Sequence, residues 1–141
     1  MSEHLLFMQL NQITLPTTDM SASVKFYQAL GLRIIVNAAP RYVRFLNPAD
    51  KATLSLHTVD GEKSGEGPVI YFELADLDAR VAELQAAGLV FEHGPVDQSW
   101  LWREARLRDP YGNLIVLYYG GENRVDPPWK VEATESAIYL M

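Results

Sequence analysis

An internal repeat restricts this chain to folds that are built from two similar halves. Residues 19–32 align with residues 76–89 without a gap, and seven of the fourteen positions are identical. Each copy begins with an aspartate suited to a helix N-cap, continues with apolar residues at helical spacing, and ends near a glycine able to adopt a left-handed conformation. The repeat therefore predicts one short helix in each half, the first between Asp19 and Gly31 and the second between Asp76 and Gly88.

Strand-like segments flank both predicted helices in the same order. They cover residues 9–16, 33–37, 41–46 and 52–59 in the first half and 68–74, 89–92, 101–108 and 114–119 in the second. Each half is thus predicted to be a βαβββ module, with module one over about residues 8–59, a linker at 60–67, module two over about 68–119 and a tail at 120–141. One module alone would leave apolar sheet surface in water, so the modules must pair, within one chain or between chains.

Alternation along the predicted strands divides their side chains between two faces. The face toward the helices is apolar and consists of Ile13, Leu15, Val43, Phe45, Leu54, Leu56, Ile70, Phe72, Ala105, Leu107, Ile115 and Leu117. The opposite face carries many aromatic and charged side chains, so we expect it to line a concave ligand site. The expected ligand-binding residues are Gln12, Tyr42, Arg44, His57, Tyr71, Glu73, Trp102, Glu104, Arg106 and Tyr118.

Composition excludes several classes of protein. The chain has 141 residues, of which 48% are hydrophobic, and this is enough for one globular domain over residues 1–141. It has no cysteine, which excludes a disulfide framework and a cysteine nucleophile. A net charge of −6 without a basic stripe argues against a nucleic-acid partner. No apolar run of roughly 20 residues and no signal-like start are present, so we expect a cytoplasmic protein without a membrane partner.

Three ordered motifs carry a family resemblance. They are LNQITL at residues 10–15, FYQALGL at residues 26–32 and RLRDPYGN at residues 106–113. Together they resemble the vicinal oxygen chelate superfamily, which includes glyoxalase I, bleomycin-resistance proteins and extradiol dioxygenases. The resemblance covers about residues 8–119. It implies an α+β fold in which two βαβββ modules form an eight-stranded, cup-shaped mixed sheet, and we expect a homodimer.

Catalytic members of this superfamily usually hold a divalent metal with four side chains, two from each module. The resemblance places Gln12, Ser55, Val69 and Val116 at these positions. Valine cannot ligate a metal and a neutral serine is a poor ligand, so we expect no metal and no other cofactor. The alternative is a sparse divalent-metal site made by Gln12, His57 and Glu73. Gln12 is at a usual position, whereas His57 and Glu73 would be shifted by roughly 7 to 13 Å along their strands.

The segment Ser99–Glu104 resembles the tryptophan-containing strand of glyoxalase-like and bleomycin-resistance-like proteins. An indole face stacks on planar or cationic ligands, and a carboxylate can supply the opposite charge. We therefore expect Trp102 and Glu104 to belong to the ligand site, and Trp100 and Trp129 to lie outside it. The alternative is that Trp102 fills the cup as packing while Glu104 pairs with Arg106 or Arg44.

These observations favour a metal-free protein that binds a small, partly aromatic or cationic molecule in its cup and has no catalytic residue. The competing hypothesis is a divalent-metal-dependent lyase, isomerase or extradiol-type dioxygenase with Glu73 or Glu104 as the base. A purely structural dimer module is the third possibility. The tail, including Trp129 and residues 138–141, is expected to pack on the domain or on a second subunit.

Overall fold

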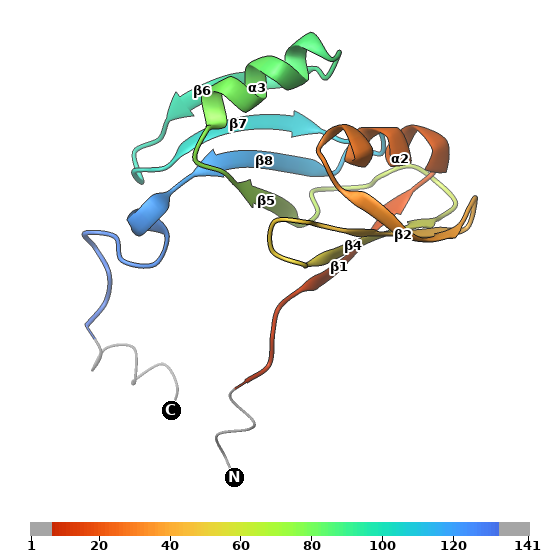
Figure 1. Cartoon of the computed structure of the whole chain (residues 1–141), viewed down its shortest axis with the longest axis horizontal. Helices are drawn as coiled ribbons and strands as arrows, with labels where there is room; N and C mark the ends of the chain where they lie inside the picture. Colours follow the sequence, from red (N-terminus) through yellow and green to blue (C-terminus); the bar gives the residue numbers. More distant parts are fainter. Residues whose placement is uncertain (1–6, 133–141) are drawn as a thin grey trace.

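The two halves of the chain form two modules with the same order of elements, βαβββ. The computed structural model describes residues 7–132 (Figure 1). Module one consists of β1 (Gln12–Thr17), α2 (Met20–Ala29), β2 (Arg33–Ala38), β3 (Tyr42–Leu46) and β4 (Thr53–Thr58). Module two consists of β5 (Val69–Glu73), α3 (Leu77–Ala86), β6 (Phe91–Asp97), β7 (Arg103–Arg108) and β8 (Leu114–Tyr119), followed by a short 3-10 helix, η1 (Gly121–Arg124).

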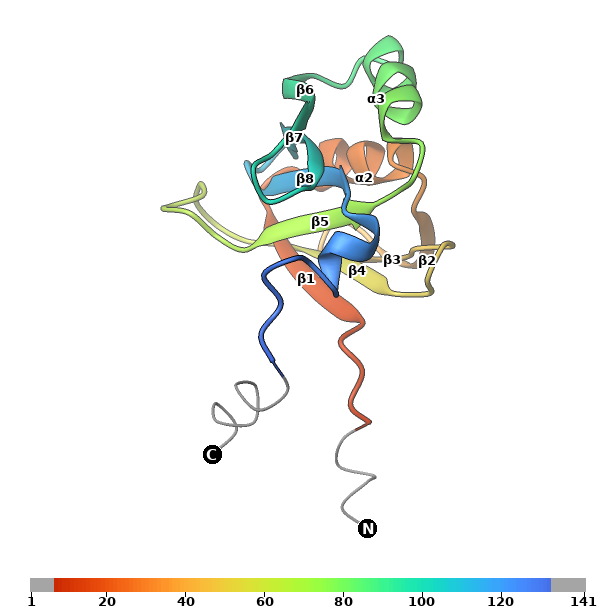
Figure 2. The same ribbon diagram turned by 90° about the vertical axis from the view of Figure 1, so that its left-hand side faces the viewer.

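The eight strands lie in two four-stranded mixed sheets, with the orders β1-β4-β3-β2 and β5-β8-β7-β6. In each sheet the outer strand, β1 or β5, pairs in parallel with the last strand of its module, and the other pairs are antiparallel. The edge strands β1 and β5 lie next to each other at the junction of the modules (Figures 1 and 2). The predicted α+β fold of two βαβββ modules is confirmed, with the strands divided between two sheets.

The strand registers of the two modules are equivalent. Ile13 pairs with Leu54 in module one as Ile70 pairs with Ile115 in module two. Phe45 likewise pairs with Leu54, as Leu107 pairs with Ile115. Along β1, β3 and β4 the register therefore gives each position a partner position in module two: Gln12 matches Val69, Ser55 matches Val116 and Tyr42 matches Glu104. Arg41, just before β3, corresponds in the same way to Arg103. Strands β2 and β6 differ, because β6 has one more register shift.

The helix ends follow the repeat. Asp19 is the N-cap of α2, and its carboxylate accepts a hydrogen bond of 3.0 Å from the backbone N–H of Ala22. Asp76 is the N-cap of α3 but makes no side-chain cap bond, and its backbone angles (φ −91°, ψ 49°) differ from those of Asp19 (φ −138°, ψ 88°). Gly31 and Gly88 follow the helices with φ of 101° and 103°, a conformation that favours glycine.

One hydrophobic core spans both modules. Its buried members come from both helices and from the predicted helix-facing side of both sheets, with Ile13, Ile70 and Phe72 packed partly buried against it. The period-two assignment of core residues is confirmed, because the strands present one apolar face to the helices. None of the helices in residues 7–132 is both long enough and apolar enough to span a bilayer.

Some element ends differ from the sequence-based expectation. Strand β1 begins at Gln12 rather than at residue 9, and Leu10 before it is fully exposed. Strand β7 begins at Arg103, because Leu101 (φ 67°) takes part in a turn closed by its N–H bond to the Gln98 carbonyl. Trp129 is 57% exposed, so it is not part of the buried core. The expected packing of residues 138–141 falls outside the described residues.

Candidate functional site

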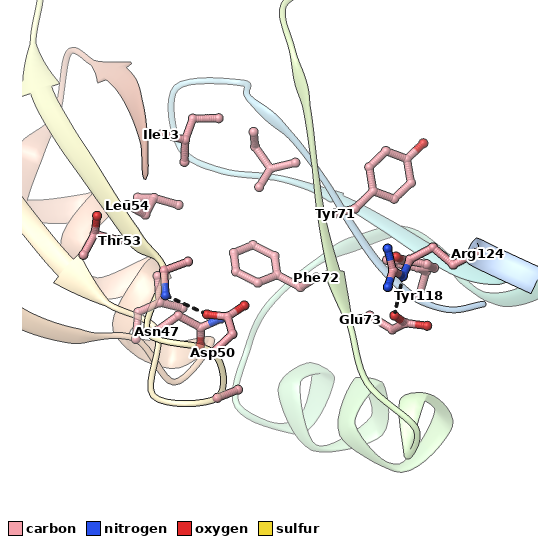
Figure 3. Close-up of a pocket in the computed structure, with 14 residues that line it drawn as sticks. Ile13, Asn47, Asp50, Thr53, Leu54, Tyr71, Phe72, Glu73, Tyr118 and Arg124 are labelled. Carbon is pink, nitrogen blue, oxygen red and sulfur yellow. Dashed lines mark hydrogen bonds and ion pairs between the residues drawn. The ribbon is translucent and has the colours of Figure 1, made fainter. Parts of the chain in front are cut away.

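A cavity of about 470 Å³ lies at the junction of the two modules. In Figure 3 the Phe72 ring points into the space that separates β5 from Ile13 and Leu54 of module one. The cavity is lined by Ile13, Leu32, Asn47, Ala49, Asp50, Ala52, Thr53, Leu54, Ile70, Tyr71, Phe72, Glu73, Tyr118 and Arg124. Its volume lies in the range typical of sites for small organic molecules, and most of its walls are apolar or aromatic.

Two acidic side chains border the cavity, and they differ in how fully they are engaged. Glu73 accepts hydrogen bonds of 2.9 Å from the backbone N–H groups of Gly120 and Gly121, and it pairs with Arg124 at 3.4 Å. Asp50 is exposed and accepts one hydrogen bond of 2.9 Å, from the backbone N–H of Ala52. Glu73 therefore holds the end of β8 and η1 in place, whereas Asp50 has oxygen lone pairs left for a ligand.

An aromatic cluster lies behind one wall of the cavity. The Trp102 and Tyr118 rings stack with centroids 4.6 Å apart, and Tyr71 meets both rings edge-on at 5.8 and 5.4 Å. The Trp102 indole N–H donates to the Asn123 carbonyl at 3.1 Å. Burial, together with the nearby Glu73 carboxylate, raises the pKa of Tyr118. Tyr71 and Tyr118 line the cavity, and Trp102 supports them from the other side.

A hydrogen-bond network occupies the corresponding face of module one. The buried Ser55 hydroxyl lies 2.6 Å from the Tyr42 hydroxyl and accepts from Gln12 Nε2 at 3.2 Å. Arg44 Nε donates to the Tyr42 hydroxyl at 2.9 Å. The hydrogen bond with Ser55, aided by Arg44, lowers the pKa of Tyr42. Gln12 also accepts from the Thr53 hydroxyl. This network ties the module-one strands together, and it reaches the cavity through Thr53.

The other predicted ligand residues lie away from the cavity lining. Glu104 is buried and accepts a 2.8 Å hydrogen bond from the Trp100 indole N–H, so this pair replaces the alternative pairing with Arg106 or Arg44. Arg106 Nε is buried and has no hydrogen-bond partner among the described residues. His57 is exposed. Of the ten predicted ligand residues, the structure thus places Tyr71, Glu73 and Tyr118 at the cavity.

The sequence interpretation missed several cavity residues. Ile13, Leu54, Ile70 and Phe72 have the helix-facing parity, which predicts a place in the core alone. At the junction of the modules this face opens onto the cavity, and strand alternation within one module gives no information about such an opening. No sequence signal pointed to Asp50, because the corresponding turn of module two, residues 109–112, has Gly112 at this place.

The four positions that hold a metal in related enzymes do not fit a metal here. Gln12 and Ser55 are hydrogen-bonded to each other, whereas Val69 and Val116 occupy the equivalent positions of module two. A valine side chain has no lone pair to donate. Within residues 7–132, no group of three or more His, Asp or Glu side chains is placed to hold a metal ion. The donor set therefore offers a divalent cation one usual ligand of the four.

Comparisons with known proteins agree with this architecture. The family model described as Glyoxalase/Bleomycin resistance protein/Dioxygenase superfamily matches residues 9–117. An uncharacterized protein of Bacillus subtilis, YraH, is 34% identical over 125 residues, which cover 79% of this chain and 98% of that protein.

Solved structures with the same fold include proteins of different activity. A glyoxalase/bleomycin resistance protein/dioxygenase from Nocardioides superposes with a TM-score of 0.73 at 23% identity, covering 93% of this chain and 99% of its own. Lactoylglutathione lyase from Agrobacterium tumefaciens has a TM-score of 0.68 at 19% identity, covering 84% and 96%. A bleomycin-binding protein complexed with bleomycin has a TM-score of 0.66 at 23% identity, covering 81% and 99%. At these identities the likeness shows a shared fold and leaves activity open.

Proposed function

Because this chain belongs to the glyoxalase/bleomycin resistance protein/dioxygenase superfamily, we propose that it is a metal-free binding protein for a small, partly aromatic or cationic molecule. The observation that carries the proposal is the cavity between the modules, with apolar walls and one incompletely engaged carboxylate. The ligand lies in this cavity, and binding alone, without a chemical step, accounts for the side chains present.

The apolar part of the ligand packs against the ring of Phe72 and against Ile13 and Leu54 on the facing module. Tyr71 adds a 47% exposed ring, whose edge contacts with Trp102 and Tyr118 hold it in position. A ring held in this way loses little freedom when a planar ligand stacks on it. These walls favour a ligand with an aromatic or other flat apolar body.

The cationic part of the ligand lies at Asp50. Glu73 is already compensated by Arg124 and two backbone N–H groups, so it adds little net attraction. The Asp50 carboxylate, by contrast, accepts one hydrogen bond from a backbone N–H and has no side-chain partner among the described residues. The chain's net charge of −6 adds a long-range attraction for cations.

Binding without catalysis is the better-supported function because three of the four usual metal positions, Ser55, Val69 and Val116, lack a usual metal ligand. A lyase, isomerase or dioxygenase of this fold would need a metal held by both modules, and module two offers Val69 and Val116. The bleomycin-binding protein with the same fold gives a precedent for small-molecule binding. We further propose that the protein is a cytoplasmic homodimer, and light scattering after gel filtration tests its dimeric state directly.

A pair of probes with one ring and opposite charges tests the proposal. We expect 2-phenylethylamine to bind more tightly than phenylacetate, as measured by calorimetry, with changes at the Phe72 and Glu73 amides in two-dimensional NMR spectra. Asp50→Asn should lower the affinity for the amine about three- to tenfold, since a solvent-open charge pair contributes on the order of 1 kcal/mol. It should leave the affinity for phenylacetate unchanged. Asp60→Asn, in the linker, is the matched control. Bleomycin is a third probe, chosen from the bleomycin-binding protein of the same fold.

The aromatic wall is tested separately. Tyr71→Ala should weaken 2-phenylethylamine several-fold through loss of the stacking surface. Trp102→Ala should weaken the binding of 2-phenylethylamine as well, because Tyr71 and Tyr118 lose their support. A separate variant, Glu104→Gln, tests whether Glu104 supplies the countercharge to the amine, as expected from the sequence. Equal affinity for the amine and the acid, or amide changes confined to residues outside the cavity, would exclude the proposed site.

A further inference from the structure

Module one carries a second hollow, of about 340 Å³, between α2 and the β2–β3 hairpin. Its floor is apolar, because Met20 and Val43 are buried and Val24 and Ile34 form the side walls. The residues that line it are Met20, Ser21, Val24, Lys25, Gln28, Ile34, Asn37, Ala39, Pro40 and Val43. None of them lines the cavity between the modules, so this groove is a separate feature, and a ligand bound in it is independent of the proposed function.

Module two shows what the equivalent place looks like when carboxylates are present. Arg103, the first residue of β7, donates two hydrogen bonds of 2.9 Å to the Asp78 carboxylate on α3. The same guanidinium donates to Asp97, at the end of β6, at 3.0 Å. The helix and the hairpin of module two are therefore joined by one cation between two carboxylates.

Module one keeps the cation and lacks both carboxylates. The strand register matches Glu104 with Tyr42, so Arg103 corresponds to Arg41, the residue just before β3. Val96 and Ala38 pair with Glu104 and Tyr42, so the residues that follow them, Asp97 and Ala39, have corresponding places in the two hairpins. The helix repeat matches Asp78 with Ser21. Arg41 directly follows Pro40, which lines the hairpin end of the groove. The equivalent of Arg41 in module two holds two carboxylates, whereas module one has an alanine and a serine at the places of those carboxylates.

A second cation lies at the groove. Lys25 lines it from the exposed side of α2, one turn after Ser21, at a position where module two has Ala82. Within residues 7–132, neither the Lys25 ammonium nor the Arg41 guanidinium makes an ion pair or a side-chain hydrogen bond. In a chain with net charge −6, two unpaired cations beside an apolar groove form a local site of the opposite sign.

We propose that this groove binds a small amphipathic carboxylate. The carboxylate group takes the place that the Asp78 and Asp97 carboxylates have in module two, between Arg41 and Lys25. The apolar chain or ring lies on Val24 and Ile34 and against Pro40. The site differs from the cavity between the modules in the sign of the charge that it selects.

Octanoate is the probe, with octylamine and octanol as controls of the same chain length and different charge. In NMR titrations of the whole protein we expect octanoate, up to about 10 mM, to shift the Val24, Lys25, Ile34 and Ala39 amides and to leave Phe72 and Glu73 unchanged. We expect octanol to bind about tenfold more weakly and octylamine to give no shifts at the groove. Equal binding of all three compounds, or no octanoate shifts at these amides, overturns the proposal.

Charge variants identify the groups that hold the carboxylate. We expect Lys25→Glu and Arg41→Glu each to lower the affinity for octanoate at least about fivefold. Lys130→Glu makes the same change in net charge outside the groove and should leave the affinity within about twofold. An equal loss in all three variants would show that octanoate responds to net charge alone and would overturn the assignment.

One substitution supplies the missing carboxylate from the chain itself. Ser21→Asp reproduces the Asp78 position of α3 opposite Arg41, and an acidic residue in the first turn of a helix is favourable. We expect this variant to fold with an unchanged or higher melting temperature and to lose octanoate binding, whereas Ser21→Asn, which has the same shape without the charge, should still bind it. Octanoate binding to Ser21→Asp that equals the wild type would contradict the proposal.

Discussion

The Tyr27 hydroxyl, on α2 of module one, donates a 2.6 Å hydrogen bond to Asp109 Oδ2, in the turn before β8 of module two. Both side chains are buried. Asp109 also accepts from Asn113 Nδ2 at 2.7 Å and from the backbone N–H groups of Tyr111, Gly112 and Asn113. This one carboxylate therefore closes the β7–β8 turn and joins the two modules across the core.

Tyr27→Phe tests this joint. The substitution keeps the buried ring, which packs edge-on against Phe26 with centroids 5.0 Å apart, and removes only the donor to Asp109. A buried carboxylate that loses one donor costs about 1–3 kcal/mol, so we expect the free energy of unfolding in urea to fall by that amount. Tyr111→Phe is the control, because its hydroxyl makes one long, exposed contact of 3.4 Å with Gly61. Equal losses in the two variants would mean that the buried bond adds nothing.

The same pair predicts a decline in stability at alkaline pH. Burial, followed by the charge and the hydrogen bond of Asp109, raises the pKa of Tyr27 far above its ordinary value. The contribution of Tyr27 is therefore complete below about pH 10, the pKa in the unfolded chain, and is lost as the pH rises further. Near pH 11 the free energy of unfolding should fall by up to about 1.4 kcal/mol per pH unit from this group.

The Tyr27→Phe variant is also the control for the pH dependence. Its stability should fall less steeply than that of the wild type between about pH 9 and 11. Some slope should remain, because burial also raises the pKa of Tyr118. Parallel curves for the two proteins would show that Tyr27 ionises as freely in the folded state as in the unfolded chain.

The fold could be predicted from the sequence because its signals are local and occur twice. The shared Asp, apolar stripe and Gly located both helices, and alternation placed Leu15 and Leu107 in the core. These features depend on a few neighbouring residues, so a second copy at the same spacing confirms each of them.

The site was less predictable because it depends on how the modules meet. Phe72 has the parity of a core residue, yet its ring lines the cavity between β5 and module one. Glu73 has the parity of a ligand residue, yet it holds the backbone of Gly120 and Gly121. Neither outcome follows from alternation along a single strand, because both depend on contacts between segments that are far apart in the chain.

Metal analysis tests the proposal that the protein works without a bound metal. Protein purified without chelator should contain no stoichiometric Zn, Ni, Fe or Mn, because Val69 and Val116 stand where two ligands are usual. Its melting temperature should not change with EDTA, since a metal held by the folded state would stabilise it. One equivalent of metal that is lost in Gln12→Ala and His57→Ala would reverse the choice between binding protein and enzyme.

Gly120 lies against the Trp102 ring. A substitution at Gly120 therefore tests the aromatic cluster without changing any of its three rings. A Cβ at Gly120 would lie 3.0 Å from Trp102 Nε1 and 3.1 Å from its Cδ1. The ring cannot easily retreat, because it stacks on Tyr118 and its N–H is bonded to the Asn123 carbonyl. At φ −110° the backbone of residue 120 accepts alanine without strain, so any cost comes from this contact.

We therefore expect Gly120→Ala to lower the free energy of unfolding by about 1 kcal/mol, as overpacking of a well-fitted site does. Without the contact with Trp102, the substitution would instead raise the free energy of unfolding by about 0.4–1 kcal/mol, because alanine reduces the backbone entropy of the unfolded chain. Gly67→Ala, with no atom within 4 Å of its Cβ, is the matched control and should gain stability in this way. Tryptophan emission of Gly120→Ala should also shift as Trp102 leaves Tyr118. If both variants gain stability equally and their emission spectra match the wild type, the added Cβ is accommodated without displacing Trp102, and the ring is not tightly fitted against residue 120.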